Sequence, residues 1–174
     1  PFVEGWFLSG EYQVSVADAA GQLARAMLAS LLTVVSASGD ALEQLDRSLA
    51  DVVVVASMVQ RETQNPLEMP HIAAIIYKRL DAGWTLGIDA SLRYALGVWD
   101  RPLSQADLEK KNPYNTRLTV GLPPTGIGSV GTAALQAALH PAENEWWYYL
   151  HDKDKTIHYA VTLEQHEANR KRYL

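Results

Sequence analysis

Apolar residues recur every three or four positions through most of the centre of the chain, which is the period of an α-helix. The first such stretch predicts a helix that begins at Ser15 or Asp18 and runs to about Leu32. Further helices are expected over residues 40–49, 51–63, 68–82, 91–96, 104–110, 132–139 and 162–173. The breaks before Pro66 and at Gly83 support these limits, because both residue types end helices.

Strand-like segments lie near the two ends of the chain. Residues 2–14 are aromatic and contain turn residues, which predicts a short hairpin or an irregular pair of strands. Residues 146–150 and 157–161 predict two more strands around the charged turn of residues 152–155. The expected fold is therefore α+β, with a mostly helical centre and short antiparallel strands near both ends, in one domain over residues 1–174.

Composition excludes several classes of function and of site. The 174 residues carry a formal net charge of -5, with Lys and Arg scattered, which argues against a nucleic-acid groove. There is no cysteine, so disulfides and thiolate metal sites are excluded. The five histidines lack the spacing of a helical metal pair. We therefore expect neither a metal nor a cofactor.

No membrane-crossing segment is expected inside the chain. The longest apolar run, residues 52–59, is interrupted by Ser57 and falls short of the ~18 residues that a spanning helix needs. The chain opens at Pro1 without a Met or a leader-like segment, so it is interpreted as a fragment or a processed product. Any membrane anchor would then lie upstream.

Glu62 is the strongest candidate for chemistry. It lies three and four positions after Val59 and Met58, so it continues the apolar face of its helix. It also lies in the last turn, where the helix dipole disfavours a negative charge by ~0.3–1 kcal/mol. Both effects raise the pKa of a carboxyl group, as a general acid requires, although Arg61 could oppose them. A solvated Glu paired with a neighbouring cation is the equally open alternative.

Three other segments could bind a sugar, and each has a structural alternative. Asp89 precedes a helix and could simply be its N-cap. Residues 113–116, Pro-Tyr-Asn-Thr, have the composition of a turn, although their phenol and amide could hold sugar hydroxyls. Residues 146–149, Trp-Trp-Tyr-Tyr, could stack on sugar rings, but aromatic residues in a strand more often lie in a core.

Several short motifs follow one another along nearly the whole chain. They are Glu4-Gly5-Trp6-Phe7, Ala56-Ser57-Met58-Val59-Gln60-Arg61-Glu62-Thr63, Ile76-Tyr77-Lys78-Arg79-Leu80, Asp89, Pro113-Tyr114-Asn115-Thr116, Gly121-Leu122-Pro123-Pro124 and Ala137-Ala138-Leu139-His140-Pro141-Ala142. In this order they resemble the motifs of the YceG-like (MltG) endolytic murein transglycosylases. The chain departs from that pattern at residues 9–11, 129–130 and Gly87, which affects substrate contacts more than the acid/base.

The resemblance implies an enzyme that cuts peptidoglycan glycan strands and leaves a 1,6-anhydro end. It implies that Glu62 is the catalytic acid/base and that no cofactor is used. The residues that it implies for substrate binding are Asp89, Tyr114, Asn115, Thr116, Glu4 and Ser57. It also implies an upstream membrane anchor and LysM-like region, a place on the extracytoplasmic face of the bacterial cytoplasmic membrane, and contact with the cell-wall synthesis machinery.

Two rival functions remain open. A muramidase would hydrolyse the same bond with Glu62, a placed water molecule and a second carboxylate such as Asp89. A non-catalytic glycan-binding domain would use its aromatic residues to bind, while Glu62 would only pair with an arginine. The products separate the first rival, because hydrolysis leaves a reducing end instead of an anhydro end.

Overall fold

The computed structural model describes residues 3–174 and contains the expected helical centre. A 3-10 turn, η1 (Val16–Asp18), leads into α1 (Ala19–Ala37), and α2 (Ala41–Leu45), α3 (Leu49–Glu62) and α4 (Met69–Asp81) follow. The remaining helices are α5 (Asp89–Leu96), α6 (Gln105–Leu108), α7 (Thr132–Leu139) and α8 (Leu163–Tyr173). The strands β1 (Tyr148–His151) and β2 (Ile157–Ala160) pair antiparallel, which confirms the α+β fold class.

Helix α3 lies at the centre of the core. Residues 52–59 are buried on every side, against α4 and α7. Valine is not a strong helix former, so burial rather than propensity stabilises this helix. The Ser48 hydroxyl caps its start by accepting a hydrogen bond from the Asp51 amide. Thr63 is extended and ends the helix, shortly before Pro66.

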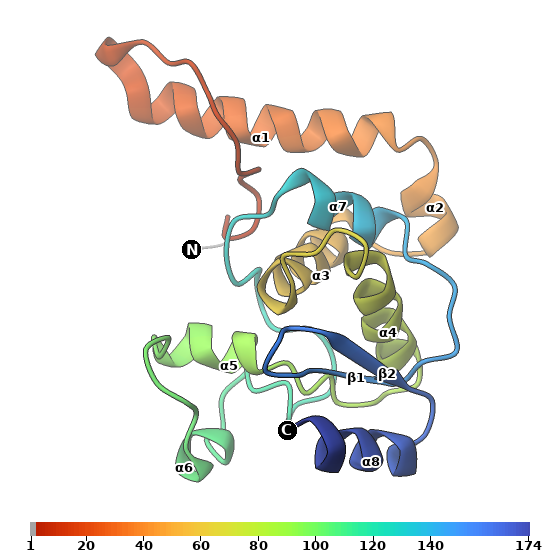
Figure 1. Cartoon of the computed structure of the whole chain (residues 1–174). Coiled ribbons are helices and arrows are strands. Elements are labelled where there is room, and N and C mark those ends of the chain that lie inside the picture. The colour runs from red at the N-terminus through yellow and green to blue at the C-terminus, as the bar shows by residue number, and fades with distance from the viewer. Residues whose placement is uncertain (1–2) are drawn as a thin grey trace.

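The other elements surround this core (Figure 1). Helix α1 passes over α7, and α5 and α6 lie together on the opposite side of the molecule. Helix α8 packs on both strands. The β1–β2 hairpin crosses the C-terminal ends of α3 and α4. Two hydrogen bonds hold it there: the Tyr149 hydroxyl donates to Glu62, and the Arg79 guanidinium donates to the Trp147 carbonyl. This crossing brings the last residue of α3 next to a strand that lies far from it in the sequence.

The N-terminal segment differs from the expected pair of strands. Residue 2 lies outside the described residues, and residues 3–14 contain a single parallel bridge, Leu8 to Val130, in place of a hairpin. The backbone amide of Ser9 also donates to the Val130 carbonyl at 2.7 Å. The segment is thus fixed by residues 121–131, the glycine-rich loop that precedes α7, instead of by a partner strand of its own.

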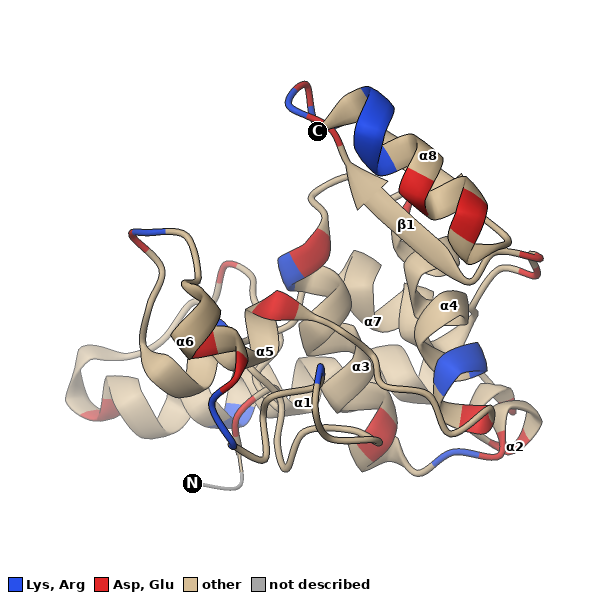
Figure 2. Ribbon diagram, turned by 90° about the horizontal axis from the view of Figure 1, so that it is seen from below, with Lys and Arg blue, Asp and Glu red and all other residues tan. Residues whose placement is uncertain are grey.

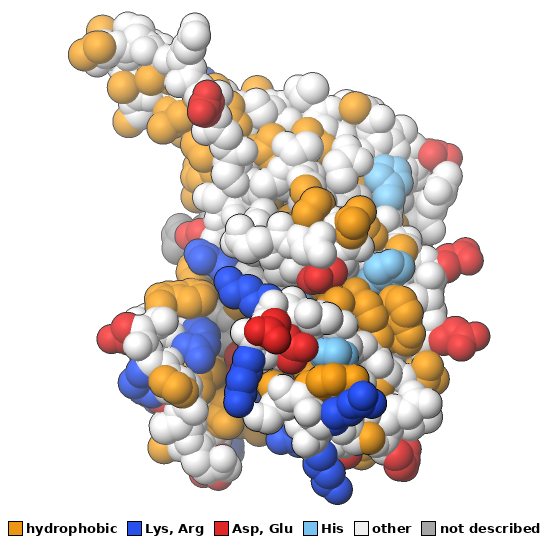
Figure 3. Space-filling model, in the orientation of Figure 1, with side chains coloured by type: hydrophobic (Ala, Val, Ile, Leu, Met, Phe, Trp, Pro, Cys, Tyr) orange, Lys and Arg blue, Asp and Glu red, His pale blue; other side chains and the backbone are white. Residues whose placement is uncertain are grey.

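One helix of the described residues is long and apolar enough to cross a membrane by length and composition, which the search for an unbroken apolar run did not predict. The helical stretch Val16–Ala37 spans 22 residues and contains an 18-residue window with a mean hydropathy of 1.3, of which 6% is buried. Isolated polar residues such as Gln22 and Arg25 break its apolar run, so a search for an unbroken run misses it. Figure 3 shows apolar side chains along this helix, which is compatible with a membrane anchor.

Charges of both signs are interspersed over the elements (Figure 2). The polar helix α8 carries acidic Glu164 in its first turn and Arg170, Lys171 and Arg172 in its last turn. This arrangement complements the helix dipole at both ends. The Thr162 hydroxyl and Gln165 form the capping box that starts it.

Candidate active site

Glu62 is the last residue of α3, and its carboxylate lies where the hairpin crosses the end of that helix. The Tyr149 hydroxyl donates a hydrogen bond to Glu62 Oε2 at 2.8 Å. Burial also raises the pKa of Tyr149 well above its usual value, with the Glu62 charge acting in the same direction. Tyr149 therefore keeps its proton and remains a donor.

The electrostatic surroundings favour a protonated Glu62. Burial raises the pKa of this carboxyl group above its usual value, and the hydrogen bond from Tyr149 partly opposes the shift. The negative charge of Asp89 raises the pKa further, while His151 and Arg117 lower it. Desolvation is the largest effect, so Glu62 is suited to hold a proton and to release it to a substrate.

Two pockets meet at Glu62. The first, about 430 Å³, lies between the ends of α3 and α4, the start of α5, and β1 and α8, and Arg79, Asp89 and Arg117 are among its lining residues. The second, about 410 Å³, follows the chain that leaves α3 and includes Glu68. Both pockets are lined by Glu62 and His151. A chain-like substrate can therefore extend to both sides of the carboxyl group.

The second pocket has an ordered polar wall. Glu68 accepts hydrogen bonds from the Thr63 hydroxyl at 2.6 Å and the Asn65 amide at 2.9 Å, and His151 Nε2 lies 3.1 Å from it. Burial alone would raise the pKa of Glu68, but these hydrogen bonds hold it below its usual value. Glu62 and Glu68 thus have pKa values shifted in opposite directions.

Asp89, which the resemblance implies for substrate binding, lines the first pocket together with Glu62. It is the first residue of α5 and makes no capping hydrogen bond, so it is not the N-cap. Instead its carboxylate pairs with Arg117 at 2.6 Å, with both side chains 42% exposed. This ion pair is exposed to solvent, and both of its residues line the first pocket.

The other predicted substrate-binding residues lie away from Glu62. Neither pocket at Glu62 is lined by Glu4, Ser57, Tyr114, Asn115 or Thr116. The side chains of Ser57, Asn115 and Thr116 are buried. Their polar atoms make hydrogen bonds within the protein.

Each of these side chains joins two segments around the site. Ser57 donates to the Val54 carbonyl and accepts from the Ile127 amide, which ties α3 to the glycine-rich loop. Asn115 donates to the carbonyls of Leu108 and Lys110 and accepts from the Arg117 amide. That last bond fixes the backbone of the residue that pairs with Asp89.

Thr116 and Tyr114 continue this scaffold. The Thr116 hydroxyl accepts from the Ile88 amide at 2.9 Å, next to Asp89. The Tyr114 hydroxyl lies 2.8 Å from the Thr125 hydroxyl and so reaches the glycine-rich loop. Turn chemistry was the alternative interpretation of residues 113–116, and the contacts agree with it.

The residues that line the pockets at Glu62 and that sequence reasoning missed include Arg79, Arg117, Tyr149 and His151. Tyr149 was noted only as one of four consecutive aromatic residues. The alternation of a strand would have separated Tyr149 and His151, on one face, from Tyr148 and Leu150. Arg79 stands in the motif of residues 76–80, which was given no role at the site; its guanidinium donates to the carbonyls of Leu86 and Trp147.

Within residues 3–174 no group of three or more metal-ligating side chains is found. Fold and site together define a helical α+β domain in which two pockets meet at a carboxyl group whose pKa is raised by desolvation. The chain belongs to the YceG-like family, whose family model matches residues 1–172.

Relatives of known name share this family. An endolytic murein transglycosylase of Bacillus subtilis is 25% identical over 173 residues, covering 99% of this chain and 48% of the relative. One from Streptococcus pneumoniae is 23% identical, covering 96% of this chain and 31% of the relative. The crystal structure of a putative YceG-like protein from Listeria monocytogenes superposes with a TM-score of 0.86 at 27% identity, covering 95% and 55% of the two chains. This chain thus spans about half the length of these relatives or less.

Proposed function

We propose that this domain is an endolytic lytic transglycosylase in which Glu62 is the single acid/base. The observation that carries the proposal is the carboxyl group of Glu62, which lines two pockets, accepts a hydrogen bond from Tyr149 and has a pKa raised by desolvation. The names of the relatives supply the substrate, a peptidoglycan glycan strand.

The proposed reaction has two proton transfers. Protonated Glu62 first gives its proton to the glycosidic oxygen between N-acetylmuramic acid and N-acetylglucosamine, and the bond to the anomeric carbon breaks. The C6 hydroxyl of the muramic acid then attacks its own anomeric carbon, while Glu62 takes up the hydroxyl proton. The product is a 1,6-anhydro end, and no water is consumed.

An intramolecular nucleophile removes the need for a second catalytic carboxylate. The two other acids beside Glu62 are already engaged, Asp89 by Arg117 and Glu68 by Thr63, Asn65 and His151. We assign Asp89 to contact with the glycan. Ser57, Tyr114, Asn115 and Thr116 are proposed to act through the loops that they hold. Glu4 is proposed as a contact of the glycan.

The proposed location follows from the substrate. A protein that cuts peptidoglycan works on the extracytoplasmic face of the bacterial cytoplasmic membrane. The long apolar helix at residues 16–37 is compatible with attachment there. Contact with the cell-wall synthesis machinery is part of this proposal.

The decisive experiment compares the products of the parent protein and of Glu62→Gln on uncrosslinked glycan strands, read by mass spectrometry. We expect anhydromuramyl ends from the parent and a loss of at least about a hundred-fold in rate for Glu62→Gln, the scale of one general acid/base. Glu68→Gln is the matched control. It should still yield anhydromuramyl ends, because Glu68 belongs to the polar wall of the second pocket and is not the proposed acid/base.

Other outcomes favour the rivals. Reducing ends that disappear with Glu62→Gln would identify a muramidase. Strands that stay intact but remain bound to both proteins would identify a glycan-binding domain.

A further inference from the structure

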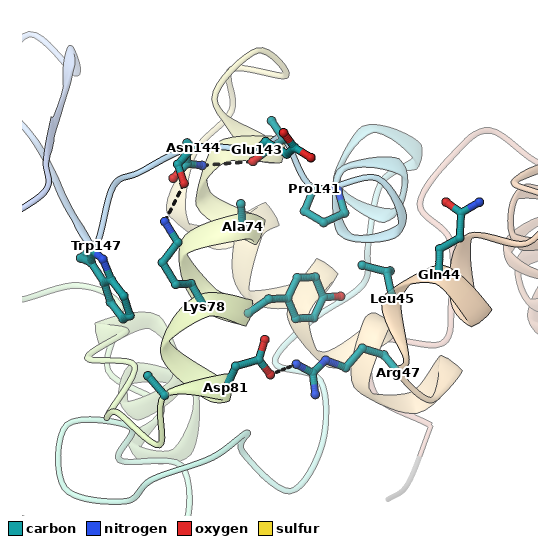
Figure 4. Close-up of a pocket in the computed structure, with 13 residues that line it drawn as sticks. Gln44, Leu45, Arg47, Ala74, Lys78, Asp81, Pro141, Glu143, Asn144 and Trp147 are labelled. Carbon is teal, nitrogen blue, oxygen red and sulfur yellow. Dashed lines mark hydrogen bonds and ion pairs between the residues drawn. The ribbon is translucent and has the colours of Figure 1, made fainter.

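The largest hollow of the described surface lies away from the active site, and its cations are already engaged (Figure 4). Its volume is about 580 Å³. Arg47 pairs with Asp81, and Lys78 donates to the Asn144 carbonyl at 2.6 Å. An anionic ligand would therefore have to displace contacts that hold this part of the chain together.

The arginines that line the first pocket of the active site are engaged as well. Arg117 pairs with Asp89 at 2.6 Å. Arg170 pairs with Glu167, three residues earlier in α8, at 3.0 Å. Arg79 donates to backbone carbonyl groups. Each of these cations thus has a partner within the protein.

The second pocket differs, because its two cations have no such partner. It is lined by Arg61, in the last turn of α3, and by Lys155, in the turn of the hairpin. Within residues 3–174, neither side chain takes part in an ion pair or in a side-chain hydrogen bond. Both side chains are exposed. Two free positive charges therefore lie in a pocket that the proposed catalytic acid also lines.

The acids of the second pocket do not balance these charges. Burial raises the pKa of Glu62, which favours the neutral, protonated form of that carboxyl group. Glu68 has a lowered pKa and is ionised, but its side chain is only 12% exposed. Its oxygens face Thr63, Asn65 and His151. Two cations against one enclosed carboxylate leave an excess of positive charge.

The guanidinium of Arg61 is held in place without using an acceptor. It lies over the Trp99 ring, 4.8 Å from the ring centroid, and Nη2 would lie 3.0 Å from a Cβ atom at residue 128, which is glycine. A cation–π contact of this kind neutralises no charge. The fork of N–H donors therefore remains available, and its geometry matches the two oxygens of a carboxylate.

Lys155 is presented by a fixed turn. The carbonyl of Asp152 accepts from the Lys155 amide, and its side chain accepts from the amides of Asp154 and Thr156. Lys155 has φ +63°, a conformation that glycine or asparagine adopts more readily than lysine. A lysine at such a position indicates that its side chain contributes something that the turn itself does not require.

We propose that the second pocket is a carboxylate-binding site, in which Arg61 and Lys155 hold an acidic group that the substrate carries beside the bond at Glu62. The source of that group rests on the proposed function. Muramic acid carries a lactyl carboxylate, and in peptide-bearing strands that group is an amide and the carboxylates lie on the stem peptide. N-acetylglucosamine has neither, so the site would distinguish the two sugars and select which bond meets Glu62.

The test measures binding by calorimetry in a Glu62→Gln background, so that the strands stay uncut. Uncrosslinked acidic strands are compared with the same strands after their carboxylates have been converted to neutral amides. We expect Arg61→Gln and, separately, Lys155→Gln to weaken binding of the acidic strands about 3- to 10-fold, between the scales of an exposed ion pair and of a hydrogen bond to a charged group. Amidated strands should bind more weakly, and equally to all variants.

Two preparations of the acidic strands separate the sources of the carboxylate. Strands stripped of their peptides carry lactyl carboxylates, whereas fully peptide-bearing strands carry those of the stem peptide. A loss of affinity for the stripped strands assigns the site to the lactyl group. A loss confined to the peptide-bearing strands assigns it to the stem peptide.

Two matched variants serve as controls. Lys153 is an exposed lysine of the same turn that does not line the pocket, so Lys153→Gln should bind acidic strands as tightly as the background protein. Arg61→Lys keeps the charge and should retain most of the affinity.

Kinetics separate the proposed site from the acid/base. In the presence of Glu62, Arg61→Gln should raise KM for acidic strands without shifting the pH dependence of kcat. The charges with the largest effect on the pKa of Glu62 are those of Asp89, His151 and Arg117, and Arg61 is not among them.

Unchanged binding of acidic strands in both Arg61→Gln and Lys155→Gln would overturn the proposal. So would an equal loss for acidic and amidated strands, which would indicate damage to the groove. A loss in Lys153→Gln as large as in Lys155→Gln would also overturn it, because the effect would then come from diffuse surface charge. Failure of the proposed function has a different result, since the protein with Glu62 intact would leave every strand uncut whether or not binding depends on carboxylates.

Discussion

At the scale of single residues, Glu62 and Tyr149 form the pair on which the proposed chemistry depends. The position of Glu62 on a buried helix face could be predicted from spacing alone. Its hydrogen-bond partner could not, because Tyr149 lies 87 residues away and reaches Glu62 only through the crossing of the hairpin over α3. His151, which lines both pockets, could not be predicted from spacing either.

Tyr149→Phe should shift the pH dependence of activity. The Tyr149 hydroxyl lowers the pKa of Glu62 by stabilising the carboxylate, so its removal raises that pKa further. Because the protonated form starts the reaction, the alkaline fall of kcat/KM should move to higher pH. The rate at the optimum should also fall by about ten-fold or more, since a hydrogen bond to a charged group is worth ~1.5–3 kcal/mol.

Tyr148→Phe serves as the control for this change, because Tyr148 points to the other face of β1 and stacks near His166. Its pH profile should match that of the parent. A Tyr149→Phe profile that also matches the parent would show that the hydrogen bond does not tune Glu62.

At the scale of elements, the helices followed their hydrophobic period closely, and Ser104 and Asp107 form a capping box at the start of α6. The N-terminal segment did not follow its β-prone composition. Its residues pair with a loop, and a bridge between Leu8 and Val130 cannot be recognised from either sequence alone. Propensity describes a local preference, whereas pairing depends on which distant segment is near.

The glycine-rich loop and the N-terminal segment lie so close together that two positions require glycine. Gly126 packs against the backbone of Gly5, and a Cβ atom at residue 126 would lie 2.7 Å from the Glu4 carbonyl oxygen. Gly5 itself has φ +88°, a conformation that side chains rarely adopt. The two glycines therefore allow the N-terminal segment to lie against this loop.

Gly126→Ala should destabilise the protein by about 1–3 kcal/mol, because backbone must move to make room for the methyl group. Thermal unfolding measures this change. Gly10→Ala is the control, since its nearest neighbour is the Tyr12 side chain at 3.5 Å and no strained φ is involved. The control should stay within about 0.5 kcal/mol of the parent. Equal stability of the two variants would contradict the close approach of residues 4 and 126.

At the scale of the whole molecule, the proposed catalytic acid, Glu62, lowers the free energy of unfolding at neutral pH. Because the folded protein raises the pKa of Glu62, it holds a proton that the unfolded chain releases above its ordinary carboxyl pKa. The folded state then binds more protons than the unfolded state. Stability must fall as the pH rises from that ordinary value to the folded pKa, and the loss is constant above it.

Glu62→Gln should therefore melt at a higher temperature than the parent at neutral pH, and the difference should vanish below pH ~4. Glu68→Gln should behave in the opposite way, because the pKa of Glu68 is lowered and its carboxylate stabilises the folded state at neutral pH. Melting temperatures measured across this pH range test both. A parent and a Glu62→Gln variant whose melting curves stay parallel would show that Glu62 is not desolvated.

The sequence by itself determined the helices, the α+β class and the position of Glu62, because these depend on periodicity and on motifs that are local in the chain. The tertiary structure alone decided which side chains surround that carboxyl group. It placed Asn115, Thr116 and Ser57 in the scaffold, and it brought Tyr149, His151 and Arg117 to the pocket. Electrostatic environment depends on distance in space and on burial, and neither can be calculated from spacing along the chain.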